Sequence, residues 1–229
     1  MPGRLIAIGD IHGCSRALAA VLHALAPRVQ DTIVTLGDYI DRGPDSAGVV
    51  EQLIRLSERC RLVPLLGNHD EMLLKILSGH QYLLHDWLAF GGEATLASYR
   101  CRTPQELPPA HLEFLRQCLD WYEAAGHFFV HAGYDPRRKL KHQTPERLRW
   151  HSLEEQTPQP HRSGKTAIVG HTAQRHGRTL DWGYLRCIDT WVYGDGCLTA
   201  LDVLRGRTWQ ADKQGRRFGQ AGQISRPFG

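Results

Sequence analysis

The stretch Gly37-Asp38-Tyr39-Ile40-Asp41-Arg42-Gly43 decides how the rest of this chain is interpreted. It follows an apolar run at residues 32–36 that is short, rich in β-branched residues and bounded by polar ones, as a buried parallel strand is. Two carboxylates and an arginine then lie between glycines, which let the backbone turn sharply beside a ligand. One carboxylate can bind metal, the other can orient a base, and the arginine can bind phosphate. A solvated turn can have the same composition, so the loop has to be judged with the other strands.

Four further apolar segments end in similar chemistry. The segments are residues 5–8, 62–66, 127–130 and 166–169, and the polar residues that follow them are Asp10, His12, Asn68, His69, His131 and His171. Helical spacing at residues 15–26 and 44–56 separates the first three strands, which predicts right-handed parallel crossovers and an α/β sheet. Because ligands collect at the carboxyl ends of such strands, we expect one site built from all five strand ends.

The segment of about residues 71–126 has a helical pattern instead. We interpret it as a small helical insertion, with one helix ending near Trp87–Gly92 and another beginning at Pro108 or Pro109 and placing Trp121 or Tyr122 inward. Short antiparallel strands are predicted at residues 184–188, 197–203 and 207–210. We therefore expect one domain over residues 1–204 and a basic C-terminal tail over residues 205–229.

Composition excludes several classes of protein. The net charge of +4 comes from the tail, whose six basic residues and one acid leave residues 1–204 at −1, so no nucleic-acid binding is expected. No apolar run reaches the roughly 20 residues of a membrane span, and no secretory signal is evident. The six cysteines are scattered without a C-x-x-C pair, which favours free thiols in the cytoplasm. A monomer is assumed.

The residue types at the five strand ends indicate what they bind. Carboxylate oxygens, an asparagine oxygen and imidazoles, without thiolates, suit manganese, iron or zinc. The ligands exceed the needs of one ion, which favours two ions bridged by one carboxylate and holding a phosphoryl group between them.

Three blocks of this sequence resemble the signature blocks of the phosphoprotein phosphatase family within the metallophosphoesterases: Gly9-Asp10-Ile11-His12-Gly13, the opening stretch, and Gly67-Asn68-His69-Asp70. His131-Ala132-Gly133 and Gly170-His171-Thr172 resemble its two later histidine blocks. The resemblance points to the small bacterial and phage-type branch of serine/threonine protein phosphatases. It implies a calcineurin-like α/β/β/α sandwich, with two mixed sheets flanked by helices.

The resemblance also implies roles for individual residues. Asp10 and His12 would bind the first metal, Asp38 would bridge, and Asn68, His131 and His171 would bind the second. The ions would be manganese, with iron, zinc or nickel as alternatives. A metal-bridging hydroxide would attack phosphorus directly, Arg42 and Asn68 would bind the phosphate, and His69, oriented by Asp41, would protonate the leaving oxygen.

One part of the family pattern is missing from this chain. Relatives carry an arginine two residues after a tryptophan in the block following His131, whereas His151 and Ser152 follow Trp150 here. Arg149 or Arg162 is the predicted replacement as a second substrate-binding arginine. Trp191 stands where a glycine is common, and either walls the pocket or belongs to the core.

Three functions remain open at this stage. We favour a dinuclear-metal-dependent phosphomonoesterase that acts as a serine/threonine protein phosphatase, with a phosphorylated protein or small phosphorylated molecule as its partner. The alternative is a symmetrical diadenosine tetraphosphate hydrolase, which the same blocks would serve. A non-catalytic metal-binding regulatory module is the third hypothesis, although metal binding alone would not require Asp41, Arg42 and His69.

Overall fold

Two five-stranded mixed sheets form the centre of the computed structural model, which describes residues 3–218. The first sheet has the order β10-β9-β1-β2-β3. Strands β1, β2 and β3 are parallel, β9 runs antiparallel to β1, and β10 runs antiparallel to β9. The bounds are Leu5–Ile8 for β1, Thr32–Thr35 for β2, Arg61–Pro64 for β3, Leu198–Asp202 for β9 and Thr208–Ala211 for β10.

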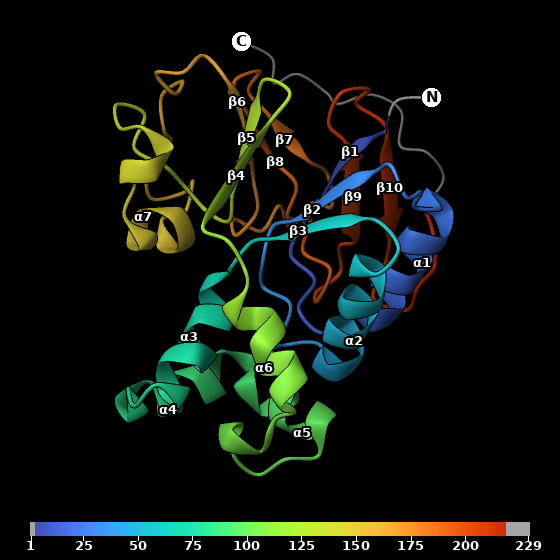
Figure 1. The fold of residues 1–229 in the computed structure, drawn as a ribbon, viewed down its shortest axis with the longest axis vertical. Helices are drawn as coiled ribbons and strands as arrows, with labels where there is room; N and C mark the ends of the chain where they lie inside the picture. The colour runs from blue at the N-terminus through green and yellow to red at the C-terminus, as the bar shows by residue number, and fades with distance from the viewer. Residues whose placement is uncertain (1–2, 219–229) are drawn as a thin grey trace.

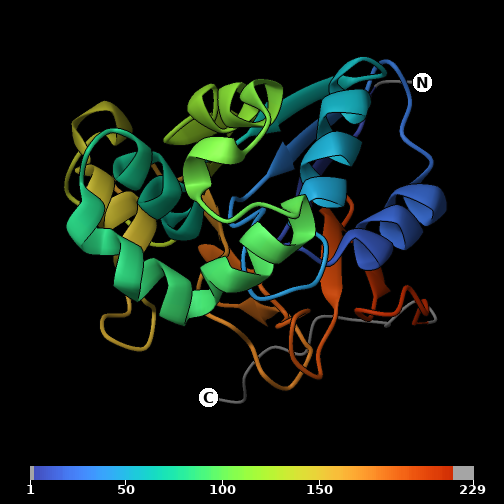
Figure 2. The ribbon, with the colours of Figure 1, turned by 90° about the horizontal axis from the view of Figure 1, so that it is seen from below.

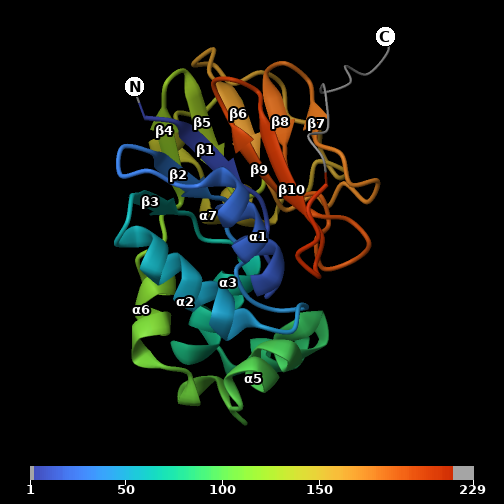
Figure 3. The same cartoon turned by 90° about the vertical axis from the view of Figure 1, so that its right-hand side faces the viewer.

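The second sheet has the order β4-β5-β6-β8-β7. Strands β5, β6 and β8 are parallel, and β4 and β7 are antiparallel edge strands. The bounds are Trp121–Ala124 for β4, His127–Val130 for β5, Thr166–Val169 for β6, Leu180–Asp181 for β7 and Leu185–Cys187 for β8. Figure 3 shows the strands of both sheets together in the upper part of the molecule.

The period-two alternation of buried strands explains how the layers stack. In β1, Ile6 and Ile8 belong to a cluster on the helix side, whereas Leu5 and Ala7 belong to a cluster shared with the second sheet. In β5, Phe129 joins the cluster between the sheets while its neighbours Phe128 and Val130 pack on the outer side. The predicted α/β/β/α sandwich with two mixed sheets is therefore confirmed.

Helices cover the outer face of each sheet. Helices α1 (Ser15–Leu25) and α2 (Ser46–Ser57) are the crossovers of the first sheet, and α7 (Pro145–Trp150) packs on the second through Leu148. The remaining helices extend below the sheets and face the viewer in Figure 2. They are α3 (Asn68–Leu77), α4 (Leu84–Trp87), α5 (Glu93–Tyr99) and α6 (Pro109–Arg116), joined by a π-helical segment at Leu88–Gly92 and by short 3-10 turns at Gln81–Leu83 and Pro104–Glu106. A further 3-10 turn, Leu140–His142, precedes α7.

Two details of the helical insertion differ from the sequence-based expectation. Trp121 and Tyr122 belong to strand β4 and not to a helix, because they pair in antiparallel register with Val130 and Phe129 of β5. Their aromatic side chains suit a strand, although their spacing continued the helical pattern. The helix expected to end near Trp87–Gly92 instead continues through a π-helical kink at Gly91, whose φ of 117° is open to glycine.

The strand predicted at residues 207–210 is confirmed near the beginning of the expected C-terminal tail. Residues 208–211 form β10 at the edge of the first sheet, with Trp209 only 8% exposed, so the beginning of the tail is part of the fold. Residues 219–229 of the expected tail lie outside the described residues. Within residues 3–218, no helix is both long and apolar enough to cross a membrane.

Candidate metal centre and active site

The carboxyl ends of strands from both sheets meet at one edge, and the expected side chains gather there. Asp10, His12, Asp38 and Asn68 come from the first sheet and its loops, and His131 and His171 from the second. All are buried except His171, which is half-buried. Nine non-glycine residues in the described part of the chain have positive φ, and five are expected site residues: His12, Asp38, Asp41, Arg42 and His171. Such strained conformations persist where surrounding structure imposes them, and they cluster at functional sites.

Asp38 lies at the centre of this group and faces a histidine from each sheet. Its Oδ2 is 3.4 Å from His12 Nε2, and its Oδ1 is 3.6 Å from His131 Nε2. In each histidine, Nδ1 is within hydrogen-bonding distance of a backbone carbonyl, that of Ile40 for His12 and that of Leu36 for His131. Assigning the proton to Nδ1 on this network leaves an Nε2 lone pair directed at Asp38. Two lone pairs facing one carboxylate fit a cation on each side of it.

The Asn68 amide oxygen has a matching environment. It lies 3.0 Å from His131 Nε2 and 3.0 Å from His171 Nδ1. His171 Nε2 is 3.1 Å from the Trp150 carbonyl, which accepts its proton and leaves Nδ1 unprotonated toward Asn68. Three acceptor atoms around one point, with each imidazole oriented by a backbone carbonyl, have the chemistry of a divalent metal site.

Burial sets the protonation of these ligands. It lowers the pKa of His12 well below the ordinary value and that of His171 to about 4. These imidazoles are therefore neutral near pH 7 and can offer a nitrogen lone pair to a metal ion. Burial alone would raise the pKa of Asp38, but His131 and the other nearby imidazoles outweigh it and hold that pKa below its usual range. Neutral imidazoles around an ionised carboxylate suit divalent cations.

Asp10 approaches the same group from β1. Both of its carboxylate oxygens accept from the His171 backbone N–H, at 3.2 and 3.0 Å. A Cβ at position 170 would lie 2.0 Å from Asp10 Oδ1, so glycine is needed for this approach. Burial, followed by the nearby Asp189 and Asp38, raises the pKa of Asp10 well above its usual value. A cation beside these three acids would relieve their mutual repulsion.

The expected acid–base pair is assembled next to the metal ligands. His69 Nδ1 is 2.7 Å from Asp41 Oδ2, and Arg42 Nη2 donates to His69 Nε2 at 3.0 Å. His69 could also join a metal-ligand group with His12 and Asp38 on distance alone. Its two nitrogens, however, already face an acid and an arginine, and an arginine N–H directed at Nε2 is incompatible with a metal ion there. This geometry favours an acid–base role for His69.

The pKa of His69 suits that role. Burial lowers it, but Asp38 and the hydrogen-bonded Asp41 raise it by more, so the net shift is upward. The raised pKa increases the fraction of imidazolium at a given pH, and once the Arg42 N–H no longer occupies Nε2, this form can pass a proton to a leaving oxygen.

The two candidates for a second phosphate-binding arginine lie in different surroundings. Arg149 is buried, with Nη1 donating to Glu71 Oε1 at 2.6 Å and Nη2 bonded to Asp120, so both Nη atoms are engaged by carboxylates. Its Nε has no hydrogen-bond partner among residues 3–218. Arg162 is exposed and lines a cavity beside α7, and its Nη1 donates to the Arg137 carbonyl. Neither arginine hydrogen-bonds to the ligand set among residues 3–218, although burial and, to a smaller extent, the charge of Arg149 lower the pKa of His131.

Several neighbours of the site had no assigned role from sequence. Thr95 in α5 donates to Asp41 Oδ1 at 2.7 Å, and the ring of Tyr193 lies 4.4 Å from the Arg42 guanidinium carbon. Asp70 accepts from the backbone N–H groups of Gly67, Asp38 and Tyr39, which joins the central loop (residues 37–43) to the start of α3.

Asp189, whose charge adds to burial in raising the pKa of Asp10, is a neighbour of the site that had a recognisable signal in the sequence. It directly follows the apolar end of a strand, as the expected ligands do. The sequence contains no such signal for Thr95 and Tyr193, which reach the site through contacts between distant elements. Asp70 is part of the block Gly67–Asp70, which was already assigned. Trp191 has a φ of 62° and packs edge-on against Tyr193.

Comparison with known proteins gives a consistent family assignment. A model described as calcineurin-like phosphoesterase matches residues 3–198. "Bis(5'-nucleosyl)-tetraphosphatase, symmetrical" from Acidovorax sp. (strain JS42) is 42% identical over 76 residues, which are 33% of this chain and 26% of that protein. The match to this curated relative thus spans about a quarter of its length.

Solved structures cover more of the chain. A crystal structure provisionally named as a diadenosine tetraphosphatase has a TM-score of 0.71 and 25% identity, and covers 92% of this chain and 95% of that one. A cold-active protein-tyrosine phosphatase from a Shewanella species has a TM-score of 0.67 and 16% identity, with 95% and 80% covered. The second likeness shows the fold alone.

Proposed function

The chain belongs to the calcineurin-like phosphoesterase family, and on that premise we propose that it hydrolyses dinucleoside polyphosphates, with symmetrical cleavage of diadenosine tetraphosphate as its reaction. The support comes from the curated relative that matches a third of the chain and from the solved structure that matches nearly all of it. This proposal reverses the preference expressed from sequence. The similarities favour a dinucleotide substrate over a phosphoprotein.

The observation that best supports hydrolysis of phosphoesters is the position of Asp38 between two groups of candidate metal ligands. Asp10 and His12 would hold one ion on its Oδ2 side, and Asn68, His131 and His171 would hold a second on its Oδ1 side. We propose manganese, with iron, zinc or nickel as alternatives, because the donors are oxygen and imidazole nitrogen. When bound, two such ions lower the pKa of water and neutralise charge on a phosphoryl group.

The chain's own residues perform the remaining steps. Arg42 lies beside both His69 and the ligand set, so its guanidinium can turn from His69 Nε2 to bind two phosphate oxygens. The ring of Tyr193 supports the guanidinium from its other side. Asn68 can offer its amide N–H to the same phosphate, as the sequence predicts. Arg42 thereby selects an anionic group and orients it for attack.

His69 handles the proton. A water oxygen bonds to one of the two central phosphorus atoms while the bond from that phosphorus to the bridging oxygen breaks. The departing ADP oxygen accepts a proton from His69 Nε2, and Asp41 Oδ2 stabilises the imidazolium through Nδ1 until that transfer. The proton released by the attacking water passes to solvent, and a solvent proton restores the imidazolium for the next turnover. The two products are both ADP, which balances water and substrate. A non-catalytic metal-binding module would need neither this pair nor Arg42.

Steady-state kinetics of the manganese-loaded protein on two substrates test the proposal. We expect diadenosine tetraphosphate to have the higher kcat/KM and to yield ADP alone, compared with a phosphothreonine peptide. ATP and AMP as products would contradict symmetrical cleavage. A higher kcat/KM for the peptide would restore the protein-phosphatase interpretation. Turnover of p-nitrophenyl phosphate alone would support the metal centre and reject both substrates.

A further inference from the structure

A cavity of about 660 Å³ lies between the loop that follows β5 and the segment that follows α7. Three arginines line it: Arg137, Arg147 and Arg162. Its volume is within the range of small-molecule sites in proteins, and the arginines give it a strongly basic lining.

The cavity adjoins the candidate metal centre through two short connections. Gly133, in its wall, lies two residues after His131, and a Cβ there would be 3.1 Å from the His151 carbonyl oxygen. His151, also in the wall, directly follows Trp150, whose carbonyl accepts from His171 Nε2 at 3.1 Å. The chain segment that carries His131 and the segment whose Trp150 carbonyl orients His171 therefore both continue into the cavity wall.

The charge of the arginines is largely uncompensated. Asp135 is the one acidic residue among the described residues that line the cavity, and its Oδ2 is already 3.3 Å from Arg138 Nε. Arg162 donates to a backbone carbonyl, and Arg147 donates to the neutral Gln156 side chain at 2.8 Å. Arg137 and Arg162 are both exposed, so their planar guanidinium groups remain accessible to an anion.

We propose that this cavity binds one nucleoside phosphate end of the substrate, the part that extends away from the reacting central phosphates. The proposal rests on the proposed function. Symmetrical cleavage places the central P–O–P bond at the ions, so each nucleoside and its adjoining phosphate must lie to one side. Arginine suits such an end because its fork binds phosphate oxygens and its flat face stacks on a base. Arg162, predicted from sequence to clamp the reacting phosphate, would instead bind this remote part.

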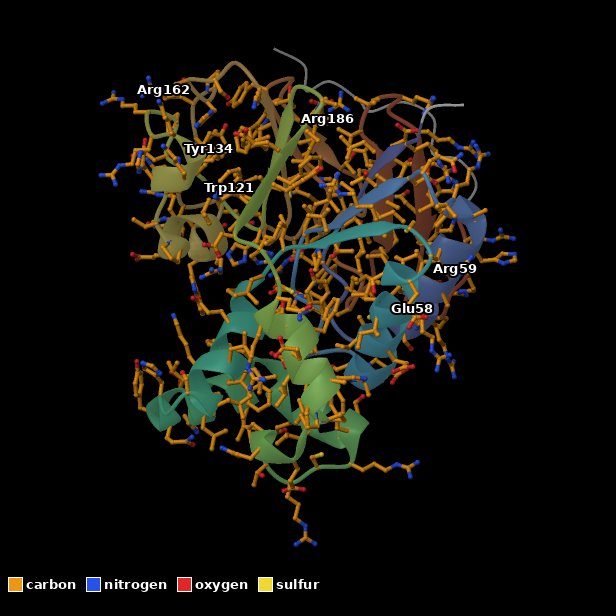
Figure 4. The ribbon with its side chains drawn as sticks, in the orientation of Figure 1. Glu58, Arg59, Trp121, Tyr134, Arg162 and Arg186 are labelled. Atoms are coloured by element: carbon orange, nitrogen blue, oxygen red, sulfur yellow. The ribbon has the colours of Figure 1, made fainter. Side chains whose placement is uncertain are left out.

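Binding of an uncleavable analogue tests the cavity separately from catalysis. The probe is diadenosine tetraphosphate with a methylene group in place of the central bridging oxygen, titrated calorimetrically into the manganese-loaded full-length protein. We expect the double variant R137A/R162A to weaken its Kd by about tenfold or more. The matched control is Arg59→Ala, an exposed arginine on the opposite side of the molecule from Arg162 (Figure 4), which should leave Kd unchanged.

A small substrate provides the second readout. With p-nitrophenyl phosphate, which has no nucleoside end, the double variant should keep the wild-type kcat/KM. An unchanged Kd for the analogue in the double variant, or no binding by the wild type, would overturn the proposal. An equal loss for both ligands would also overturn it, because the arginines would then act on the site as a whole. If the wild type binds the analogue through these arginines but does not cleave diadenosine tetraphosphate, the proposed function fails and the cavity assignment stands.

Discussion

His69 lies between the Asp41 carboxylate and the Arg42 guanidinium, and this position leads to a prediction about a single residue. Its Nδ1 faces Asp41 and its Nε2 accepts from Arg42, while neither nitrogen is needed as a ligand. Replacing His69 by Asn should lower kcat by about 10²–10⁴-fold, the usual contribution of a positioned general acid. The metal content should remain that of the wild type, because Asp10, His12 and Asp38 are untouched.

The measurement combines steady-state kinetics with elemental analysis of the loaded protein. Unchanged turnover in His69→Asn would refute the acid role. Loss of metal together with activity would instead make His69 a ligand, as its distance from His12 and Asp38 allows.

Helix α5 positions the central loop from outside it, which is a feature at the scale of elements. Thr95 donates to Asp41 Oδ1 and accepts from the Asp41 N–H at 2.8 Å, and the Gly91 carbonyl of the adjoining kink accepts from the Arg42 N–H. Asp41 and Arg42 both have positive φ, so these bonds hold two strained residues in place. The helical insertion thus holds the central loop in place directly.

Thr95→Val keeps the shape of the side chain but removes the hydroxyl. It should cost about 1–3 kcal/mol of stability, because the buried Asp41 Oδ1 loses its hydrogen-bond donor, and it should lower kcat by more than it alters KM. Thr95→Ser is the matched control and should restore most of both. If Thr95→Ser were as impaired as Thr95→Val, the methyl group and not the hydroxyl would be responsible.

The start of β1 is tied to the end of α1 by one buried carboxylate. Asp31 accepts from the Arg4 side chain and backbone and from the Arg28 N–H, while Arg4 also donates to the Leu25 carbonyl. Burial raises the pKa of Asp31, but these hydrogen bonds outweigh it, so the pKa lies below its ordinary value. The ionised form therefore stabilises the fold.

Asp31→Asn should lower the free energy of unfolding by about 2 kcal/mol at pH 7. The folded-state pKa lies below the unfolded value of about 3.9, so the contribution is complete above that value and is lost as the pH falls through the folded one. The difference between wild type and variant should therefore shrink below about pH 4, as measured by urea unfolding. Glu58→Gln, at an exposed acid, is the control and should change little at any pH. A difference independent of pH would refute the electrostatic origin.

At the scale of the whole molecule, the candidate metal centre joins the two sheets. Asp38 belongs to a loop of the first sheet, and His131 follows β5 of the second. Ions held there would stabilise the folded state by mass action, about 2.7 kcal/mol at a concentration of 100 times Kd. For a domain of this size that corresponds to a rise in Tm of roughly 5–10 °C.

Calorimetric scans with manganese and with a chelator check this prediction. The chelator should lower Tm and abolish activity, and added manganese should restore both. Asp38→Asn should remove most of the metal-dependent rise, since Asp38 faces both ligand groups. A Tm that does not depend on the metal would contradict a centre that joins the sheets.

Some features of the fold and of the candidate site could be predicted from the sequence, and others could not. The gathering of Asp10, His12, Asp38, Asn68, His131 and His171 could be predicted because each follows a short apolar strand, and parallel strands bring such ends to one edge. Their role as metal ligands stays a prediction. The role of Trp121 in β4 was predicted wrongly, because a helical spacing continued past the end of α6 and the pairing with β5 is not local. Thr95 could not be predicted, because its contact with Asp41 spans 54 residues and depends on how α5 packs.

The amino-acid sequence by itself determined the α/β class and the candidate metal ligands, because short apolar strands and the polar residues that follow them are local signals, and its resemblance to the metallophosphoesterases implied the family and the two-sheet sandwich. Only the tertiary structure decided which atoms face each other. It oriented the His12, His131 and His171 imidazoles through backbone carbonyls, engaged Arg149 with two carboxylates, and placed Arg162 in the basic cavity that Gly133 and His151 also line. These outcomes depend on contacts between residues far apart in the chain, where packing and burial, and not local propensity, select the partner.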